Sequence, residues 1–217
     1  MKKWTAIALV LMMFLTLTAA AEETINLPRV TEKNSVLYDN SYLGYSLRVW
    51  EYFTAVPDAA NQDQLKLIQE NEDEDDDHVY DVRYWVVAVT ENEYMTFCVQ
   101  LKERSCETFE QEVANAAVYA EIANAKLPED GSLGHYENVH EGILRDTPAG
   151  QMLETAYRFT DAQGKQMTVV YYDFYYNTIE YCFVLENESS LISVETMQQL
   201  LGDMMSTISV QNVISEV

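Results

Sequence analysis

Four consecutive stretches between about residues 137 and 186 alternate apolar and polar side chains, and short turn signals separate them. The turns are predicted at 146–150, 161–164 and 175–177, where Asp, Asn, Gly or Pro occur. These residue types favour the tight reversals that join antiparallel neighbours. One face of the last stretch is formed by Ile179, Tyr181, Phe183 and Leu185. We therefore expect a four-stranded antiparallel meander, with that face turned to the core.

The first half of the chain predicts further strands. In residues 43–49, every second side chain is apolar, so these side chains share one side of an extended strand. Residues 79–90 and 94–101 are rich in β-branched and aromatic side chains, which favour strands. The short apolar run at residues 65–68 predicts one more strand.

Two helices complete the pattern. Residues 108–125 repeat small and apolar side chains at helical spacing, and Thr108 and Gln111 are suited to a capping box at the start. Residues 193–209 predict a closing helix with Ser193 as its N-cap. Its apolar stripe consists of Met197, Leu200, Leu201, Met204 and Ile208. An antiparallel sheet packed by a middle and a C-terminal helix belongs to the α+β class.

This order of elements resembles the PsbP-like fold, shared by the extrinsic PsbP protein of photosystem II and by small exported bacterial proteins of the DcrB-like kind. The resemblance covers about residues 42–209 and lies in the pattern rather than in a diagnostic motif. The matching features are Leu43-Gly44-Tyr45-Ser46-Leu47, the middle helix, the strand pair around Gly164, the Tyr171-Tyr172 and Ile179-Glu180-Tyr181 strands, and the final helix.

Two features depart from the family pattern. Trp50-Glu51-Tyr52-Phe53 stands where the family commonly has a turn with Pro and Trp, and the acidic segment at residues 70–77 is unusual. The resemblance implies an accessory or binding role without an established reaction. It therefore carries no catalytic residues over to this chain.

The first residues predict export. Lys2 and Lys3 precede an apolar stretch at residues 6–17, and Ala19-Ala20-Ala21 offers the small residues that a signal peptidase requires. The apolar stretch is shorter than the roughly 20 residues that a membrane-spanning helix needs. We therefore expect a signal peptide at 1–21, a leader at 22–41 and a single domain at 42–217. The mature chain is expected to be soluble outside the cytoplasm, with no stable membrane insertion after cleavage.

The charge of the chain bears on its partners and its function. Its 36 acidic and 13 basic side chains give a formal net charge of −23, so we expect no nucleic-acid partner. The sequence contains no GxSxG, HExxH, P-loop or dinucleotide motif. We expect an exported, non-enzymatic accessory or binding module that contacts an unidentified protein or envelope component, with no cofactor. The alternative is an exported hydrolase whose site is built from dispersed carboxylate and histidine residues.

The acidic segment at residues 70–77 is a candidate calcium site. Asp73, Asp75 and Asp77 would supply carboxylate oxygens, which Ca²⁺ prefers. The segment lacks the Gly and the terminal Glu of an EF-hand loop. A solvated loop of like charges is therefore the preferred interpretation.

A second candidate metal site consists of His135, Glu137, His140 and Glu141. In a strand, His135 and His140 would point to opposite faces, and their spacing also misses the i, i+4 relation of a helix. We therefore favour surface or turn histidines over metal ligands.

The cysteines and tyrosines supply the remaining candidates. Cys98, Cys106 and Cys182 permit at most one disulfide, and Cys98 and Cys182 lie in apolar strands that suggest buried core positions. Among 15 tyrosines, Tyr172 and Tyr176 are candidate binding residues, on the expectation that Tyr172 is exposed and Tyr176 lies near the following turn. Packing in the core or at a sheet edge is the alternative, which we favour.

Overall fold

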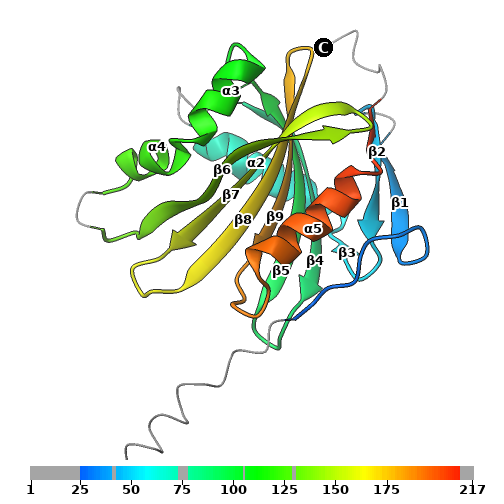
Figure 1. Ribbon diagram of the computed structural model, residues 1–217, viewed down its shortest axis with the longest axis horizontal. Helices are drawn as coiled ribbons and strands as arrows, with labels where there is room; N and C mark the ends of the chain where they lie inside the picture. The colour runs from blue at the N-terminus through cyan, green and yellow to red at the C-terminus, as the bar shows by residue number, and fades with distance from the viewer. Residues whose placement is uncertain (1–24, 41–42, 73–77, 105, 129–130, 211–217) are drawn as a thin grey trace, which may run out of the picture.

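The computed structural model describes residues 25–40, 43–72, 78–104, 106–128 and 131–210 (Figure 1). Four helices and two antiparallel sheets make up this part of the chain, which confirms the α+β class. In chain order, the elements are β1 (Ser35–Asn40), β2 (Tyr45–Trp50), β3 (Thr54–Ala55), α2 (Asp58–Asn71), β4 (Val79–Ala88), β5 (Tyr94–Glu103), α3 (Phe109–Ala116), α4 (Tyr119–Ala125), β6 (His135–Thr147), β7 (Gly150–Thr160), β8 (Gln166–Tyr176), β9 (Ile179–Asn187), α5 (Val194–Met205) and β10 (Ser209–Val210).

The predicted meander is confirmed as β6 to β9, in which each strand pairs with the next. Strand β9 then pairs with β5, so the large sheet has the order β3-β4-β5-β9-β8-β7-β6. The turn between β6 and β7 ends at Gly150, whose φ of +123° is a conformation that other residues rarely adopt. The turn between β8 and β9 uses Asn177 with a φ of 54°.

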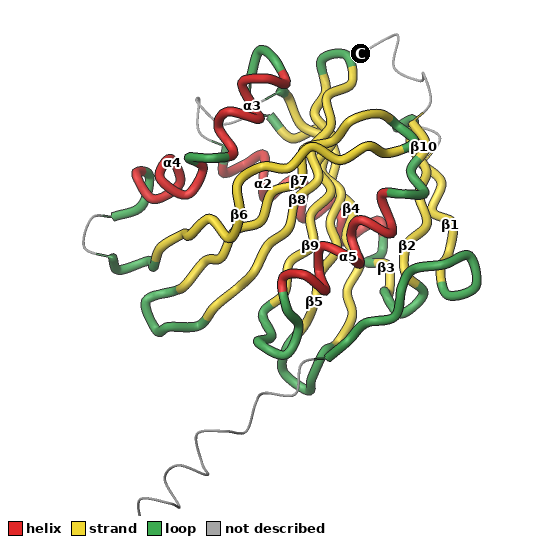
Figure 2. The backbone as a smooth tube through the Cα atoms, viewed as in Figure 1, coloured by secondary structure: helices red, strands yellow, loops and turns green. Residues whose placement is uncertain are grey.

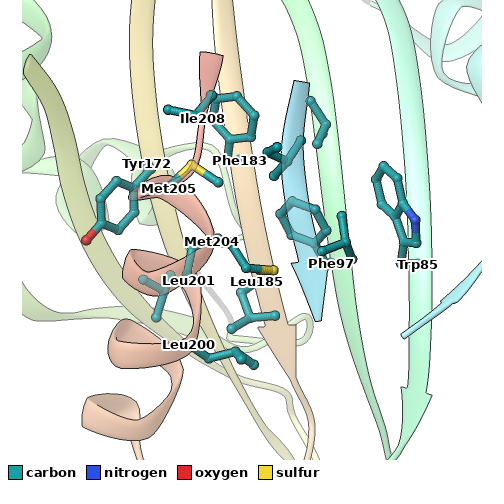
Figure 3. Packing of buried hydrophobic residues seen from close by; sticks show 14 of the residues in the cluster. Trp85, Phe97, Tyr172, Phe183, Leu185, Leu200, Leu201, Met204, Met205 and Ile208 are labelled. Atoms are coloured by element: carbon teal, nitrogen blue, oxygen red, sulfur yellow. The ribbon is translucent and has the colours of Figure 1, made fainter. Parts of the chain in front are cut away.

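The main core lies between one face of the large sheet and a cover formed by α5 and the small sheet β1-β2-β10 (Figures 1 and 2). Figure 3 shows Leu200, Leu201 and Met204 of α5 near Leu185 of β9, and Phe183 of the same strand near Ile208. Ser193 caps α5 by accepting a hydrogen bond from the Thr196 backbone. The side chains of the apolar stripe predicted for the closing helix are therefore confirmed as part of the core, but α5 ends at Met205, and Ile208 lies beyond it. Burying each such side chain contributes about 1.5–3 kcal/mol.

The opposite face of the large sheet is also covered. A smaller apolar cluster there contains the buried side chains of Cys98, Val169, Cys182 and Val184. Helix α2 is drawn behind the sheet in Figure 1, and α5 in front of it. Because strands β5, β8 and β9 are buried on both faces, their buried residues do not simply alternate along the sequence.

The predicted middle helix is two helices, α3 and α4. The capping box of Thr108 and Gln111 is confirmed at the start of α3. The break falls at Val118, whose φ of −120° and ψ of 9° leave the helical region. Asn138 of β6 stabilises the break, because its side chain accepts from the Ala120 backbone N–H and donates to the Ala117 carbonyl. A contact from a distant strand therefore divides a helix that local spacing predicts as continuous.

The predicted strand at residues 65–68 is wrong, because these residues lie within α2. The surrounding Gln, Lys, Glu and Ala residues favour a helix, and Pro57 stands at the N-cap. Asn61 fixes this helix to β4, since its side chain donates to the Val56 carbonyl and accepts from the Tyr84 backbone N–H. The apolar run at residues 65–68 is too short to outweigh the helix-favouring residues around it.

Residues 25–40, which the sequence assigns to a leader, take part in the fold. Strand β1 pairs with β2 along its whole length, from Ser35 opposite Trp50 to Asn40 opposite Tyr45. Backbone hydrogen bonds hold this edge strand, so it needs no continuous apolar face. Its side chains, with Val36 and Leu37 exposed, therefore show no sustained apolar period in the sequence. The predicted signal peptide lies outside the described residues. No helix within the described part of the chain is long and apolar enough to cross a membrane.

Candidate functional site

The candidate calcium residues Asp73, Asp75 and Asp77 lie outside the described residues. The ends of their segment are held by ordinary contacts. Glu72 accepts a hydrogen bond of 2.8 Å from the Val79 backbone, and its other carboxylate oxygen lies 2.8 Å from Nδ1 of His78. Calcium binding by this segment therefore stays a prediction.

Tyr172 is not exposed, contrary to the expectation from the sequence. Only 3% of its surface is accessible, because the alternation of β8 places it on the core face with Val170 and Phe174. Tyr176 lies on the same face at the end of the strand, half-buried, with its ring 6.2 Å from that of Phe174. The two tyrosines therefore do not form a shared exposed surface in this structure.

The hydroxyl of Tyr172 donates a 2.5 Å hydrogen bond to Glu154 of β7, which is almost fully buried. Arg145 of β6 donates two hydrogen bonds to the same carboxylate, at 2.8 and 3.1 Å, and the Gln198 amide of α5 donates another at 2.5 Å. Burial opposes ionisation, but the hydrogen bonds from Arg145, Tyr172 and Gln198 outweigh it and lower the pKa of Glu154 below its ordinary value. The Glu154 cluster, which consists of Arg145, Glu154, Tyr172 and Gln198, therefore links α5 to the sheet through a carboxylate whose charged form these hydrogen bonds favour.

The structure brings one of the two candidate histidines to this cluster. His140 Nε2 lies 2.7 Å from the Gln198 amide nitrogen and 3.6 Å from Glu154 Oε1. His135 instead lies 3.3 Å from Glu137 in an exposed position. His140 therefore belongs to the surroundings of Glu154, whereas His135 contacts Glu137, and the absence of metal binding by these residues stays a prediction. Sequence analysis missed Glu154, which is one of many acidic residues.

A second cluster lies on the opposite face of the sheet, and we call it the acidic pocket: Thr155, Asp173, Glu180 and Cys182. Asp173 of β8 pairs directly with Cys182 of β9, while Glu180 is two residues before Cys182 on the same face. Their exposed fractions are 6% for Asp173, 1% for Glu180 and 4% for Cys182. One carboxylate oxygen from each acid and the Cys182 sulfur all lie within 4.8 Å of one another.

The polar groups of the acidic pocket are only partly satisfied. Lys102 of β5 places its ammonium 3.2 Å from Glu180 Oε1, and the Cys182 thiol donates to the same oxygen at 3.2 Å. By contrast, Asp173 Oδ1 and Thr155 Oγ1 are buried without a hydrogen-bond partner among the described residues. A buried polar atom left in this state costs about 1–3 kcal/mol. A ligand that formed hydrogen bonds to these two atoms would remove this cost.

The electrostatics of the acidic pocket follow from its burial. Loss of water and the nearby charge of Glu180 raise the pKa of Asp173 well above its ordinary range. Burial and the charge of Asp173 likewise raise the pKa of the Cys182 thiol. Perturbed groups of this kind gather at functional sites more often than elsewhere.

The residues of the acidic pocket line a partly open cavity of about 240 Å³. Helices α3 and α4 contribute Glu112 and Tyr119 to its lining, and the Tyr119 ring stacks on Tyr157 of β7 at 4.1 Å. Sequence analysis identified Cys182 as a buried residue, which is confirmed, but missed the acidic pocket. The signal available was a pair of charged residues, Asp173 and Glu180, at positions inside otherwise apolar and aromatic strands.

Comparisons with known proteins support the fold. No protein-family model matches the chain, and no curated protein matches it in sequence. Cyanobacterial PsbP (CyanoP) from Synechocystis sp. PCC 6803 is similar in structure, with a TM-score of 0.50 and 12% identity over 86% of this chain and 98% of that one. LpqN of Mycobacterium tuberculosis, a protein involved in cell envelope biogenesis, has a TM-score of 0.43 and 11% identity over 86% of this chain and 100% of its own. The likeness to CyanoP confirms the PsbP-like fold.

Proposed function

We propose that this chain is an exported, non-enzymatic binding module that holds a small, positively charged ligand in the acidic pocket. The observation that carries this proposal is Asp173, a residue that lines the cavity and whose buried Oδ1 has no hydrogen-bond partner among the described residues. A buried carboxylate oxygen without a hydrogen-bond partner is costly. A cationic ligand removes that cost and adds a direct attraction.

The charge and size of the acidic pocket define its ligand. Its lining includes the carboxylates of Glu112, Asp173 and Glu180 and the single ammonium of Lys102, so acidic groups are in excess. The cavity of about 240 Å³ is smaller than the roughly 300–1,000 Å³ of ordinary small-molecule sites. A metal ion or an amine of a few atoms fits these properties, whereas a large substrate does not.

The alternative, an exported hydrolase, has less support. A hydrolase acting through Asp173 and Glu180 must bring a scissile bond to carboxylates that are 6% and 1% exposed. A hydrolase acting through Glu154 and His140 must use a carboxylate whose oxygens already accept hydrogen bonds from three side chains and whose pKa is lowered. General acid catalysis instead requires a carboxyl group with a raised pKa.

The proposal also places the module outside the cytoplasm, in contact with a protein or an envelope component. The predicted signal peptide supports this location. The formal net charge of −23 favours a partner with a basic surface. Within the described residues, Arg29, Arg83, Arg145 and Lys165 are in ion pairs with this chain's own carboxylates, so their charges are already compensated.

The experiment compares binding with turnover. Thermal unfolding is recorded with divalent metal chlorides and with methylammonium and ethylammonium chloride, for the original protein, for Asp173→Asn, and for the exposed control Asp63→Asn. The same proteins are assayed with chromogenic esters, glycosides, phosphates and peptides. We expect at least one cation to raise the melting temperature of the original protein and of Asp63→Asn but not of Asp173→Asn, without turnover. Turnover that Asp173→Asn or Glu154→Gln abolishes would establish the hydrolase instead, and the lack of any Asp173-dependent cation effect would refute the binding site.

A further inference from the structure

We propose that the ligand of the acidic pocket is a divalent transition-metal ion of the Zn²⁺ class, bound by Asp173, Glu180 and Cys182. This inference rests on the proposed function and narrows its ligand from small cations in general to one chemical class. It assigns a metal to a site that the sequence analysis did not single out.

The first argument is the convergence of the three side chains. Asp173 and Cys182 are a directly opposed pair in the ladder between β8 and β9, and Glu180 leaves β9 on the same face. Their potential ligand atoms lie within 4.8 Å of one another. Zinc–oxygen distances of about 2.0–2.2 Å and zinc–sulfur distances of about 2.3 Å place ligand atoms roughly 3–4 Å apart, so small side-chain rotations are sufficient.

The second argument is the combination of donor atoms. Hard cations such as Ca²⁺ and Mg²⁺ prefer oxygen ligands and gain little from a thiol. Zn²⁺ and Co²⁺ accept sulfur and carboxylate oxygen together. Binding replaces the proton of the Cys182 thiol, and the proton of Asp173 when that carboxyl group carries one, by the metal, and these protons are released to solvent. The fourth position is open to water, and Thr155, whose Oγ1 has no hydrogen-bond partner among the described residues, lines the same cavity and can hydrogen-bond to that water after a rotation of its side chain.

The third argument separates a metal from an organic amine. The Lys102 ammonium, 3.2 Å from Glu180 Oε1, already supplies the interaction that an amine would make. An amine would not use the Cys182 sulfur. A metal ion binds the Cys182 sulfur and the Oδ1 atom of Asp173 together. The positive charge of Lys102 then repels the metal ion. Removing the Lys102 ammonium is therefore expected to strengthen metal binding. If Lys102 only forms a structural salt bridge with Glu180, its removal would not affect metal binding.

The experiment uses Co²⁺ as a spectroscopic probe. The parent protein is the predicted mature chain, residues 22–217. It carries Cys98→Ser and Cys106→Ser, so that Cys182 is its only thiol. Millimolar Ca²⁺ is present throughout to occupy sites built from oxygen alone. We expect Co²⁺ to give a thiolate-to-cobalt charge-transfer absorption that saturates at one equivalent and disappears when Zn²⁺ displaces it.

Three variants in this parent test the ligands. Cys182→Ser should abolish the charge-transfer absorption, and Asp173→Asn should weaken Co²⁺ binding by at least about tenfold, the lower end of effects seen for metal-site residues. Lys102→Met should strengthen binding severalfold. Circular dichroism confirms that each variant is folded, and the near-isosteric Asn and Ser replacements keep the volume of the pocket.

The outcomes distinguish this inference from the proposed function. If methylammonium or ethylammonium stabilises the protein through Asp173 while Co²⁺ and Zn²⁺ do not bind, the metal assignment is wrong and the proposed function stands. If neither kind of cation binds, both are wrong. Co²⁺ binding that is unchanged in Cys182→Ser and Asp173→Asn would place the metal elsewhere and overturn the assignment.

Discussion

Asp173 and Cys182 face each other across the β8–β9 ladder, and both side chains are buried on the side of the sheet away from α5. The neighbouring residues Tyr172 and Phe183 project to the other side, into the main core. The same two strands therefore build an apolar core on one face and the acidic pocket on the other. This arrangement positions the pocket groups on rigid strands rather than on loops.

The first prediction concerns the pH dependence of stability in metal-free protein. Asp173 has a raised pKa in the folded state, so it binds its proton more tightly when folded. Its contribution to stability is complete below the unfolded pKa of about 4 and is lost as the pH rises toward the raised folded value. Urea unfolding of the original protein should therefore show a stability loss between about pH 5 and pH 8, and Asp173→Asn should reduce it.

Asp63→Asn is the matched control for this measurement, because Asp63 is exposed on α2. It should keep the pH dependence of the original protein. Parallel stability curves for the original protein and Asp173→Asn would show that Asp173 is ionised normally in the folded state.

The second prediction concerns the Glu154 cluster. Tyr172→Phe removes the hydroxyl that donates to the buried Glu154 carboxylate and should cost about 1.5–3 kcal/mol of unfolding free energy, as expected for a hydrogen bond to a charged group. Tyr176→Phe, at a half-buried position on the same strand, should cost less than about 0.5 kcal/mol. Chemical denaturation of both variants tests this. Equal losses would mean that the Glu154 cluster does not stabilise the attachment of α5.

The pH dependence of this cluster has the opposite sign. The pKa of Glu154 is lowered in the folded state, so its contribution is present above the unfolded pKa of about 4.3 and is lost as the pH falls through the folded value. Glu154→Gln should therefore be most destabilising near neutral pH and less so in acid. A destabilisation that does not change with pH would show that the charge of Glu154 is unimportant.

The third prediction concerns the packing of α5. Leu201 is fully buried against the sheet, so Leu201→Asp should cost several kcal/mol and leave the chain largely unfolded, since domains are stable by only about 5–15 kcal/mol. Gln199→Asp is the control, because Gln199 is exposed on the same helix. Gln198 is unsuitable as a control, since its amide contacts Glu154 and His140. If Leu201→Asp melts like Gln199→Asp, α5 is not part of the core.

The fourth prediction concerns export. Ala19 and Ala21 occupy the small-residue positions of a signal-peptidase site, so exported protein should begin at Glu22. N-terminal sequencing of the exported chain measures this directly. Recovery of the intact chain from Met1 in the membrane fraction would contradict the predicted cleavage.

The periodicity of the sequence correctly predicted the elements in which the apolar side chains recur regularly on one buried face. The meander and the stripe of α5 are clear examples, because a two-residue or 3.6-residue period directly reports a buried face. Strand β1 escaped prediction because an edge strand is held by backbone pairing and exposes Val36 and Leu37. The division between α3 and α4 escaped because it depends on Asn138, which is distant in sequence.

The candidate site was harder to predict for a related reason. Asp173 and Cys182 become neighbours only through the exact register of β8 against β9, and Thr155 joins them from β7. The sequence contains 36 acidic residues, and the local signal that distinguishes Asp173 and Glu180 is their position inside otherwise apolar and aromatic strands. Helices α3 and α4 contribute Glu112 and Tyr119 to the lining of the cavity, and these contacts are between residues distant in sequence.

The central claim is that the acidic pocket holds a metal ion, and a crystal structure of the Zn²⁺-loaded protein with anomalous data at the zinc edge tests it most directly. We predict an anomalous peak within about 2.0–2.4 Å of one oxygen of Asp173, one oxygen of Glu180 and the sulfur of Cys182. Crystals of protein that contains one equivalent of zinc, but with the peak elsewhere and the acidic pocket without zinc, would contradict the claim.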